Sequence, residues 1–249
     1  MINRRALLSL LLLVWLPARA DEINVAVAAN FLGTLQQLAP GFEQASGHRL
    51  VLSAGSSGQL YAQIQQGAPF DVFLSADSER PRLLETQGLG VAGSRFTYAV
   101  GTLVLWSPRA SVVDARGNIL RSSDFKLLAI ANPDSAPYGA AAKQVLLAMG
   151  IWDQINRDRR IAMGQDINQA WQFAVSGNAD LAFIAKSQLK DASGSSWEPP
   201  QSQYSEIDQD CVILARSSKQ SSARVFTGWL RTDSQAVALI AAAGYRVKE

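Results

Sequence analysis

The sequence predicts an α/β fold in which mainly parallel sheets are flanked by helices. Two observations lead to this prediction. Short apolar runs rich in β-branched residues recur along the chain, and segments with helical spacing of apolar residues lie between them. Several of the runs lack alternating polar residues, which is typical of strands covered on both faces. Strands that alternate with helices favour parallel sheets.

The predicted strands are seven apolar runs. They cover residues 23–29, 49–54, 71–76, 102–106, 127–131, 180–185 and 211–215. Residues 190–209, with paired prolines at 199–200, have the composition of a loop.

The predicted helices follow from apolar spacing and from glycine stop signals. Leu32, Leu35, Leu38 and Phe42 share one helical face, although Pro40 is expected to bend or split that helix. Further helices are expected from Leu60 to Gly67, over residues 138–150 and over 167–177. The pattern over residues 222–247 predicts two helices and a last short extended piece.

Residues 1–20 have the pattern of a secretory signal peptide. Arg4 and Arg5 precede an apolar run over residues 6–16, and the segment ends in the small-x-small sequence Ala18-Arg19-Ala20. The run is shorter than the roughly 20 residues that a membrane span needs. We therefore expect cleavage after Ala20 and export.

Composition and charge exclude several classes of function. The 249 residues, 48% of them hydrophobic, are enough for one large domain or two lobes. The formal charge of the whole chain is +2; loss of residues 1–20 removes three arginines and no acid, leaving −1. No basic stripe survives, so a nucleic-acid partner is not expected. The single cysteine, Cys211, and the single histidine, His48, exclude an intrachain disulfide and the usual zinc ligand sets.

Four strand-to-helix junctions share the same chemistry. In open α/β sheets, ligands bind beyond the carboxyl ends of strands, where helices begin. The junctions read AANFLG (28–33), SAGSSGQL (53–60), ANPDSAPYGAAAK (131–143) and GQDINQAW (164–171). Asn30, Ser56 or Ser57, and Asp166 stand where helix N-caps are expected. Tyr138 follows Pro137 at the start of another helix.

Each helix start leaves backbone N–H groups without intrahelical partners and carries a partial positive charge. Several such starts aimed at one point bind an anion without a formal positive charge. The junctions contain no lysine or arginine before Lys143, and the GxxxxGK[ST] motif of nucleotide P-loops is absent from the sequence. Together they predict a site for a compact anion, although each junction alone is more often an ordinary cap than a ligand site.

Two other classes of function stay open at this point. A hydrolase could use Ser56 or Ser57 with Lys186, but His48 lies at the opposite end of the second strand from the serines, and no carboxylates pair at a suitable spacing. A structural or adhesive module would be expected to show repeats or an exposed apolar stripe.

The chain resembles, over almost its whole length after residue 20, the periplasmic molybdate-binding proteins of ABC transporters. The resembling segments cover residues 25–48, 53–77, 131–153, 164–184 and 244–247. The resemblance implies a two-lobed periplasmic-binding-protein fold of type II, with the ligand cleft between the lobes. Residues 21–100 and 216–249 would form the first lobe and 101–215 the second, with hinges near 98–102 and 214–218.

The resemblance also implies a set of ligand-binding residues. Asn30 and Ser57 would contribute from the first lobe, and Tyr138 and the main-chain N–H of Ile167 from the second. Further candidates are Ala29, Phe31 and Ser56. The chain departs from the family pattern where many members have Ser in place of Asn30, a small residue in place of Tyr138 and Tyr in place of Ala185; some have Thr in place of Ala29.

The function implied by the resemblance is transport. The protein would bind molybdate, and tungstate as well, in the periplasm and deliver it to the membrane permease of an ABC transporter. It would act as a monomer and would be a binding protein rather than an enzyme. It would need no cofactor, and molybdenum would be present only as the oxyanion. The alternatives are a binding protein for another tetrahedral oxyanion, such as sulfate, and a serine-dependent hydrolase.

Overall fold

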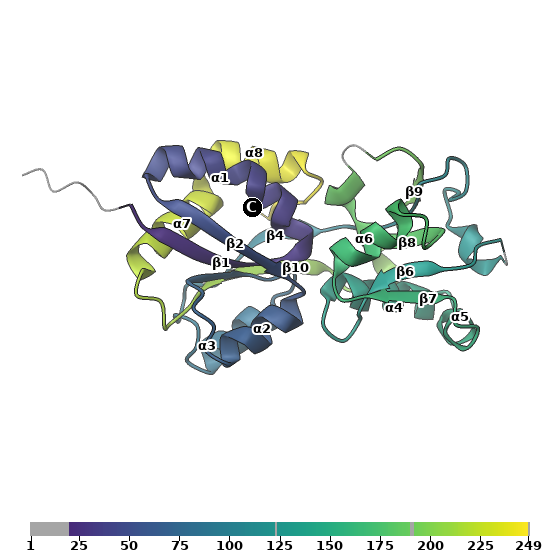
Figure 1. Ribbon diagram of the computed structural model, residues 1–249, viewed down its shortest axis with the longest axis horizontal. Helices are drawn as coiled ribbons and strands as arrows, with labels where there is room; N and C mark the ends of the chain where they lie inside the picture. Colours follow the sequence, from purple (N-terminus) through teal and green to yellow (C-terminus); the bar gives the residue numbers. More distant parts are fainter. Residues whose placement is uncertain (1–19, 123, 190–191, 249) are drawn as a thin grey trace, which may run out of the picture.

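The computed structural model describes residues 20–122, 124–189 and 192–248. These residues form two lobes that lie side by side, each built on a five-stranded sheet with helices on both faces (Figure 1). The predicted signal peptide lies outside the described residues, apart from Ala20. None of the helices in the described ranges has the length and apolar character that a membrane crossing requires.

The first lobe contains the sheet with strand order β2-β1-β3-β10-β4. Its strands are β1 (Glu22–Ala28), β2 (Arg49–Gly55), β3 (Val72–Leu74), β4 (Phe96–Gly101) and β10 (Ile207–Ile213). Its helical elements are the 3-10 turn η1 (Ala29–Phe31) and helices α1 (Leu32–Ser46), α2 (Ser57–Gln65), α3 (Glu79–Thr86), α7 (Gln220–Thr232) and α8 (Ser234–Ala242). Strand β1 runs parallel to β2 and β3, whereas β10 is antiparallel to β3 and β4.

The second lobe contains the sheet with strand order β7-β6-β8-β5-β9. Its strands are β5 (Leu103–Ser107), β6 (Leu128–Ala131), β7 (Ile161–Gly164), β8 (Leu181–Ala185) and β9 (Ser195–Trp197). Its helical elements are α4 (Pro137–Ala148), α5 (Trp152–Arg157), α6 (Ile167–Val175) and the 3-10 turns η2 (Asn118–Arg121), η3 (Lys186–Leu189) and η4 (Gln201–Gln203). Strand β6 is parallel to β7 and β8.

Each sheet separates two hydrophobic clusters. In the first lobe, α1, α7 and α8 cover one face and α2 and α3 the other (Figure 1). In the second lobe, α4 and α5 lie on one face and α6 on the other. Because helices cover both faces, every residue of β5 and β8 is buried, which accounts for the absence of polar alternation in those runs.

The predicted elements are largely confirmed, with two differences at the level of elements. Each of the seven apolar runs contains a strand, but β4, β7, β9, α3 and α5 were not predicted. Helix α1 continues past Pro40 without a break. Proline removes one intrahelical hydrogen bond, and the buried face with Leu35, Leu38 and Phe42 holds the helix together.

The return of the chain to the first lobe differs from the expected boundary. Strand β10 pairs with β3 and β4, so the chain re-enters the first lobe before Ile207, whereas the resemblance implied that residues 101–215 would form the second lobe. The first half of β10 holds Asp208, Gln209 and Asp210, and this polar run has the composition of a loop. Gln209 and Asp210 are nevertheless fully buried.

Candidate functional site

A narrow cavity lies where four helix starts from the two lobes meet. Asn30 and Ser57 line it from the first lobe, and Tyr138 and Ile167 from the second. The whole lining consists of Ala28, Ala29, Asn30, Gly55, Ser56, Ser57, Ala76, Ala136, Pro137, Tyr138, Asp166 and Ile167. The four predicted residues are therefore brought together in one place.

Parallel strand pairing explains why these starts converge. Ala28 at the end of β1 pairs in register with Gly55 at the end of β2, so η1 and α2 begin at the same sheet edge. Ala131 at the end of β6 pairs with Gly164 at the end of β7, which places the starts of α4 and α6 together in the second lobe. The two sheet edges face each other across the cavity.

The cavity is small: its volume is about 10 Å³, close to the roughly 10–15 Å³ that one water molecule needs. Among the described residues that line it, none is lysine or arginine, and Asp166 is the one carboxylate. Any negative guest would therefore be held by neutral donors.

Ser57 is the first residue of α2 and presents two donors. The preceding Ser56 forms a capping box with Gln59: Ser56 Oγ accepts from the Gln59 N–H, and Gln59 Oε1 accepts from the Ser56 N–H, both at 3.3 Å. The cap leaves the N–H of Ser57 without a partner inside its helix. Ser57 Oγ accepts from the Ala76 N–H at 2.9 Å, so its own hydrogen is left for another acceptor.

Ile167 holds the equivalent place in α6. The carboxylate of Asp166 caps this helix and accepts from the N–H groups of Asn168 at 2.9 Å and Gln169 at 3.0 Å. The first N–H, that of Ile167, is left over at the cavity. The charge of Asp166 is engaged by the donors of its own helix.

Asn30 differs from the sequence expectation, because it is not an N-cap. It lies within η1, and its side-chain Nδ2 donates to Gln209 Oε1 at 2.8 Å and to Tyr245 Oη at 3.2 Å. Both amide hydrogens thus have acceptors within the first lobe. The main-chain N–H of Asn30, in the first turn of η1, is the donor that this residue can offer to a guest.

Tyr138 contributes a hydroxyl rather than a cap. Pro137 occupies the first position of α4, where its missing N–H costs no hydrogen bond. The Tyr138 ring is fully buried, and Oη accepts from Gln209 Nε2 at 3.3 Å. Burial, with a further contribution from nearby Tyr245, raises the pKa of Tyr138 well above its ordinary value. The hydroxyl therefore stays protonated and can donate.

The other candidates divide. Ala29 and Ser56 line the cavity, but Phe31 does not. The ring of Phe31 packs against those of Tyr98 and Tyr245, with centroids 4.7 and 5.4 Å away. Ala185, where many family members have tyrosine, is fully buried in the same hydrophobic cluster as Tyr138.

The serine–lysine pair of the hydrolase alternative is not assembled. Lys186 Nζ pairs with Glu198 Oε1 at 2.6 Å, and Lys186 lines a different pocket. Ser57, by contrast, lines the narrow cavity. Without a base at hydrogen-bonding distance, neither Ser56 nor Ser57 is activated as a nucleophile.

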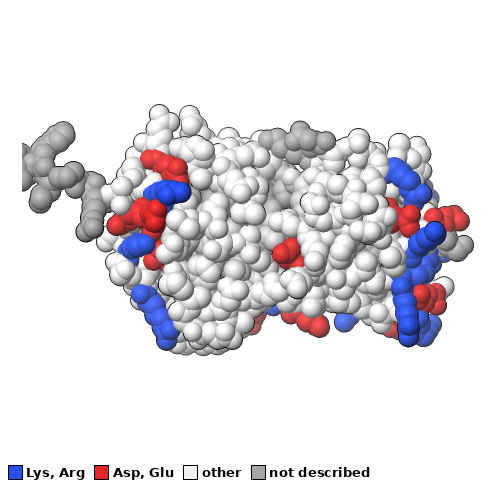
Figure 2. Space-filling model, in the orientation of Figure 1, with Lys and Arg blue, Asp and Glu red and all other residues white. Residues whose placement is uncertain are grey.

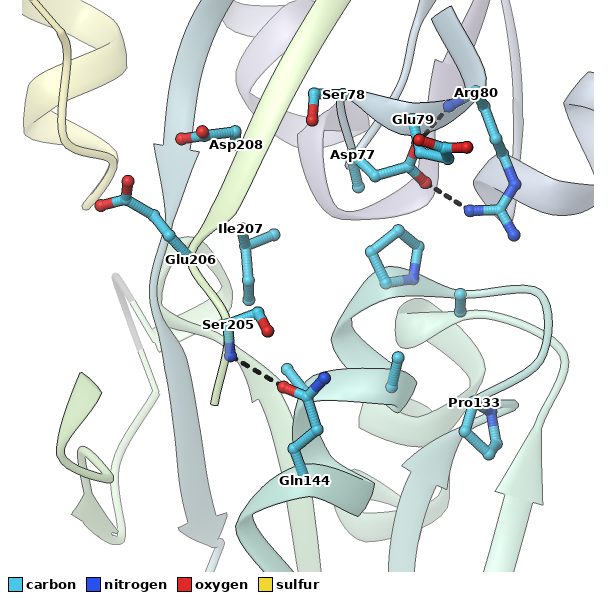
Figure 3. A pocket seen from close by; sticks show the side chains of 15 residues that line it. Asp77, Ser78, Glu79, Arg80, Pro133, Gln144, Ser205, Glu206, Ile207 and Asp208 are labelled. Atoms are coloured by element: carbon cyan, nitrogen blue, oxygen red, sulfur yellow. Dashed lines mark hydrogen bonds and ion pairs between the residues drawn. The ribbon is translucent and has the colours of Figure 1, made fainter. Parts of the chain in front are cut away.

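A larger groove of about 290 Å³ adjoins the cavity and shares Ala76, Ala136 and Pro137 with it. Its charged lining residues are Asp77, Glu79, Arg80, Glu206 and Asp208. Figure 3 shows Arg80 turned toward Asp77, with which it forms an ion pair. Because its only guanidinium is already paired and the other charges are carboxylates, this groove suits an anion less well than the cavity does.

The lobes contact each other around the cavity. The Gly58 N–H of α2 donates to Ser135 O at 2.8 Å, and Asn168 Nδ2 of α6 donates to Ala29 O at 3.1 Å. Ser187 Oγ donates to Asn30 O at 3.3 Å. These bonds join the two lobes in a closed arrangement.

Gln209 is the residue that sequence reasoning missed. It touches both Asn30 and Tyr138, which stand 179 and 71 positions away in the chain. The available signal was a polar residue two positions before the apolar run 211–215, but no short-range pattern connects it to the four junctions. On the face drawn in Figure 2, charged side chains gather mainly at the far ends of the two lobes, and the area around their junction is nearly free of charge.

Comparison with known proteins agrees with this geometry. The family model described as bacterial extracellular solute-binding protein matches residues 23–246. The molybdate-binding protein ModA of Azotobacter vinelandii is 46% identical over 232 residues, covering 92% of this chain and 91% of the relative. ModA of Rhodobacter capsulatus is 43% identical over 239 residues, covering 96% and 93%.

A solved structure gives the same result for the fold. The periplasmic molybdate-binding protein of Azotobacter vinelandii matches with a TM-score of 0.89 at 43% identity, over 91% of this chain and 100% of that chain. The two-lobed fold and the family resemblance predicted from the sequence are confirmed. The chain belongs to the bacterial extracellular solute-binding proteins and, among them, to the family of the molybdate-binding protein ModA.

Proposed function

We propose that this protein binds molybdate in the periplasm and delivers it to the membrane permease of an ABC transporter. The observation that carries the proposal is the single narrow cavity in which uncharged donors from both lobes converge. The relatives that match most of the chain are named for molybdate binding, which favours molybdate over the sulfate alternative. They are binding proteins rather than enzymes, and the proposed binding needs no cofactor.

The proposed ligands are neutral groups. The main-chain N–H groups of Asn30, Ser57 and Ile167 and the hydroxyls of Ser57 and Tyr138 would donate to the oxygens of one doubly negative anion. A hydrogen bond to a charged group contributes roughly 1.5–3 kcal/mol. About five of them could therefore supply the roughly 8 kcal/mol that a micromolar dissociation constant requires.

Capture would proceed by closure of the lobes. Neither lobe offers all the donors, so binding favours the arrangement in which both sets face the guest. The lobes would hinge at residues 98–102 and at the second segment that joins the lobes, which lies between β9 and β10. The closed monomer would then dock on the permease.

Selectivity would arise from size and ionisation. Donors fixed at helix starts cannot follow a smaller tetrahedron without lengthening their hydrogen bonds, so molybdate and tungstate should bind better than sulfate. A protonated oxyanion such as hydrogen phosphate would present an O–H to a ring of donors and leave it without an acceptor.

Thermal unfolding of the protein lacking residues 1–20 tests the proposal. We expect molybdate and tungstate to raise the melting temperature, and sulfate, phosphate and nitrate to leave it nearly unchanged at equal concentration. A ligand at 100 times its dissociation constant adds about 2.7 kcal/mol to the free energy of unfolding. A shift with sulfate as large as that with molybdate would favour the general oxyanion alternative, and no shift with any anion would refute the proposal.

A further inference from the structure

Gln209 lies at the centre of a buried hydrogen-bond network beside the cavity. It is fully buried on β10, at the point where the register of β10 with β4 shifts. Its Oε1 accepts from Asn30 Nδ2 at 2.8 Å, and its Nε2 donates to Tyr138 Oη at 3.3 Å. One side chain thus connects a cavity residue of the first lobe with one of the second.

The hydrogen bonds that lead from Asn30 to Tyr138 take their direction from one main-chain carbonyl, whereas either atom can donate in the 3.0 Å contact between Ser187 Oγ and Tyr245 Oη. Asn30 O can only accept, and it accepts from Tyr245 Oη at 2.7 Å. Since Tyr245 has spent its hydrogen there, its oxygen must accept from Asn30, which therefore presents Nδ2. The same Nδ2 faces Gln209, so Gln209 presents Oε1 to it.

The last step fixes the tyrosine hydrogen. With Oε1 committed to Asn30, the Nε2 group of Gln209 faces Tyr138, and an amide nitrogen can only donate. The Tyr138 oxygen is consequently the acceptor, and its hydrogen must point away from Gln209. Tyr138 lines the narrow cavity, so an acceptor placed there is the partner that this hydrogen can reach.

Packing holds the contact in place. Gly101, the last residue of β4, passes so close that an added Cβ would lie 2.1 Å from Tyr138 Oη and 2.8 Å from Gln209 Nε2. The Tyr138 hydroxyl and the Gln209 amide therefore fit against the backbone of Gly101, and neither group has room to rotate toward that backbone.

We infer that Gln209 is a positioning residue for the anion site: by donating to the oxygen of Tyr138, it directs the Tyr138 hydrogen into the cavity. The inference rests on the proposed function, since it needs an anion as the acceptor. Gln209 itself does not line the cavity and acts through Tyr138.

A double-mutant cycle with molybdate tests the inference by isothermal titration calorimetry. Tyr138→Phe removes the directed hydroxyl, and Gln209→Met removes the amide while keeping a side chain of similar length. We expect each single change to raise the dissociation constant about tenfold, the loss of about one hydrogen bond. In the Tyr138→Phe background, Gln209→Met should change affinity less than about twofold, because the group it positions is already gone. Equal effects of Gln209→Met in both backgrounds would overturn the inference.

Tyr98→Phe is the matched control. The Tyr98 hydroxyl also contacts Gln209 Oε1, at 3.2 Å, but it lies 3.1 Å from Ser75 O and is outside the cavity lining. It should leave molybdate affinity within about twofold of wild type, whereas a loss equal to that of Tyr138→Phe would show that the network acts only through general stability.

A second substitution covers the case in which Gln209→Met fails to fold. Gln209→Glu keeps an acceptor for Asn30; titrated at pH 9, where the carboxyl is ionised, it has no donor for Tyr138, so the carboxylate would take the tyrosine hydrogen and repel the anion. We expect an affinity loss above about tenfold, and wild-type affinity would overturn the inference. Absence of molybdate binding by the wild-type protein would instead refute the proposed function.

Discussion

At the scale of single residues, two adjacent serines have different tasks. Ser56 closes the capping box of α2 with Gln59, whereas Ser57 lines the cavity with a hydroxyl whose oxygen is already engaged by the Ala76 N–H. The capping pattern separates them: the cap residue satisfies the N–H of the third helical residue, and the first helical residue keeps its N–H for a guest.

Ser56→Ala and Ser57→Ala should therefore affect different quantities. We expect Ser57→Ala to raise the molybdate dissociation constant about tenfold, because it removes a hydrogen bond to a charged partner. Ser56→Ala should lower the free energy of unfolding by about 1 kcal/mol through loss of the cap, with a smaller effect on affinity. Calorimetric titration and urea denaturation of both variants measure the two quantities; a larger loss of affinity from Ser56→Ala would contradict the assignment.

The dependence of binding on pH follows from the donors. Main-chain N–H groups do not titrate, and burial keeps the pKa of Tyr138 well above its ordinary value. Ionisation of Tyr138 would remove a donor and add a negative charge, so affinity should fall only as the pH rises through that raised pKa, above about 10. We expect the dissociation constant for molybdate to stay within about threefold between pH 6.5 and 9. A steady loss of affinity across this range, measured by titration in matched ionic strength, would show that a group of lower pKa controls binding.

Residue types revealed the site only in part. A local pattern predicts a helix start at Ser56 or Ser57 and another at Ile167, because a cap and a helix start are adjacent in sequence, but the resemblance was needed to single out Ser57 and Ile167 as ligand candidates. The role of the Asn30 side chain and the presence of Gln209 could not be found in this way. Their contact joins positions 179 residues apart, and it depends on a strand whose polar first half resembles a loop.

At the scale of elements, α2 contacts the loop before α4 across the boundary between the lobes. The Gly58 N–H donates to Ser135 O at 2.8 Å, and a Cβ on Gly58 would lie 2.9 Å from that oxygen and 3.0 Å from Ser135 Cα. Both atoms belong to the backbone of the other lobe, so they cannot turn aside as a flexible side chain could. Glycine at this position allows the two lobes to approach.

Gly58→Ala should accordingly weaken binding without weakening the fold. Alanine favours the interior of a helix over glycine by about 1 kcal/mol, so the melting temperature of the ligand-free protein should stay equal or rise. Molybdate affinity should fall at least about tenfold, because the closed arrangement is obstructed. Gly228→Ala in α7 is the control, since an added Cβ there meets no heavy atom within 4 Å; affinity unchanged in both variants would contradict the role of this contact.

Elements were predictable where apolar residues dominate them. The interior strands β1, β5, β6 and β8 are covered on both faces and appear in the sequence as apolar runs. Strand β7 was missed because it lies at the edge of its sheet, and three of its four residues, Ile161, Ala162 and Met163, are only partly buried or exposed. Pro40 suggested a break in α1 that burial of the surrounding apolar face overrides.

At the scale of the whole molecule, the two lobes have equivalent binding edges. In each sheet, two neighbouring parallel strands end at the cavity. They are β1 and β2 in the first lobe and β6 and β7 in the second. Each lobe contributes helix starts, and neither contributes a lysine or arginine to the described lining. A compact anion held between them would be bound by groups from both halves, so binding and closure are expected to be one event.

The most direct measurement is the position of the metal atom in a crystal of the protein grown with molybdate, located by anomalous diffraction at the molybdenum absorption edge. The account predicts one strong anomalous peak in the narrow cavity, within reach of Asn30, Ser57, Tyr138 and Ile167, with no lysine or arginine in contact. A peak in the charged groove beside Asp77 and Arg80, or on the surface of one lobe alone, would contradict it.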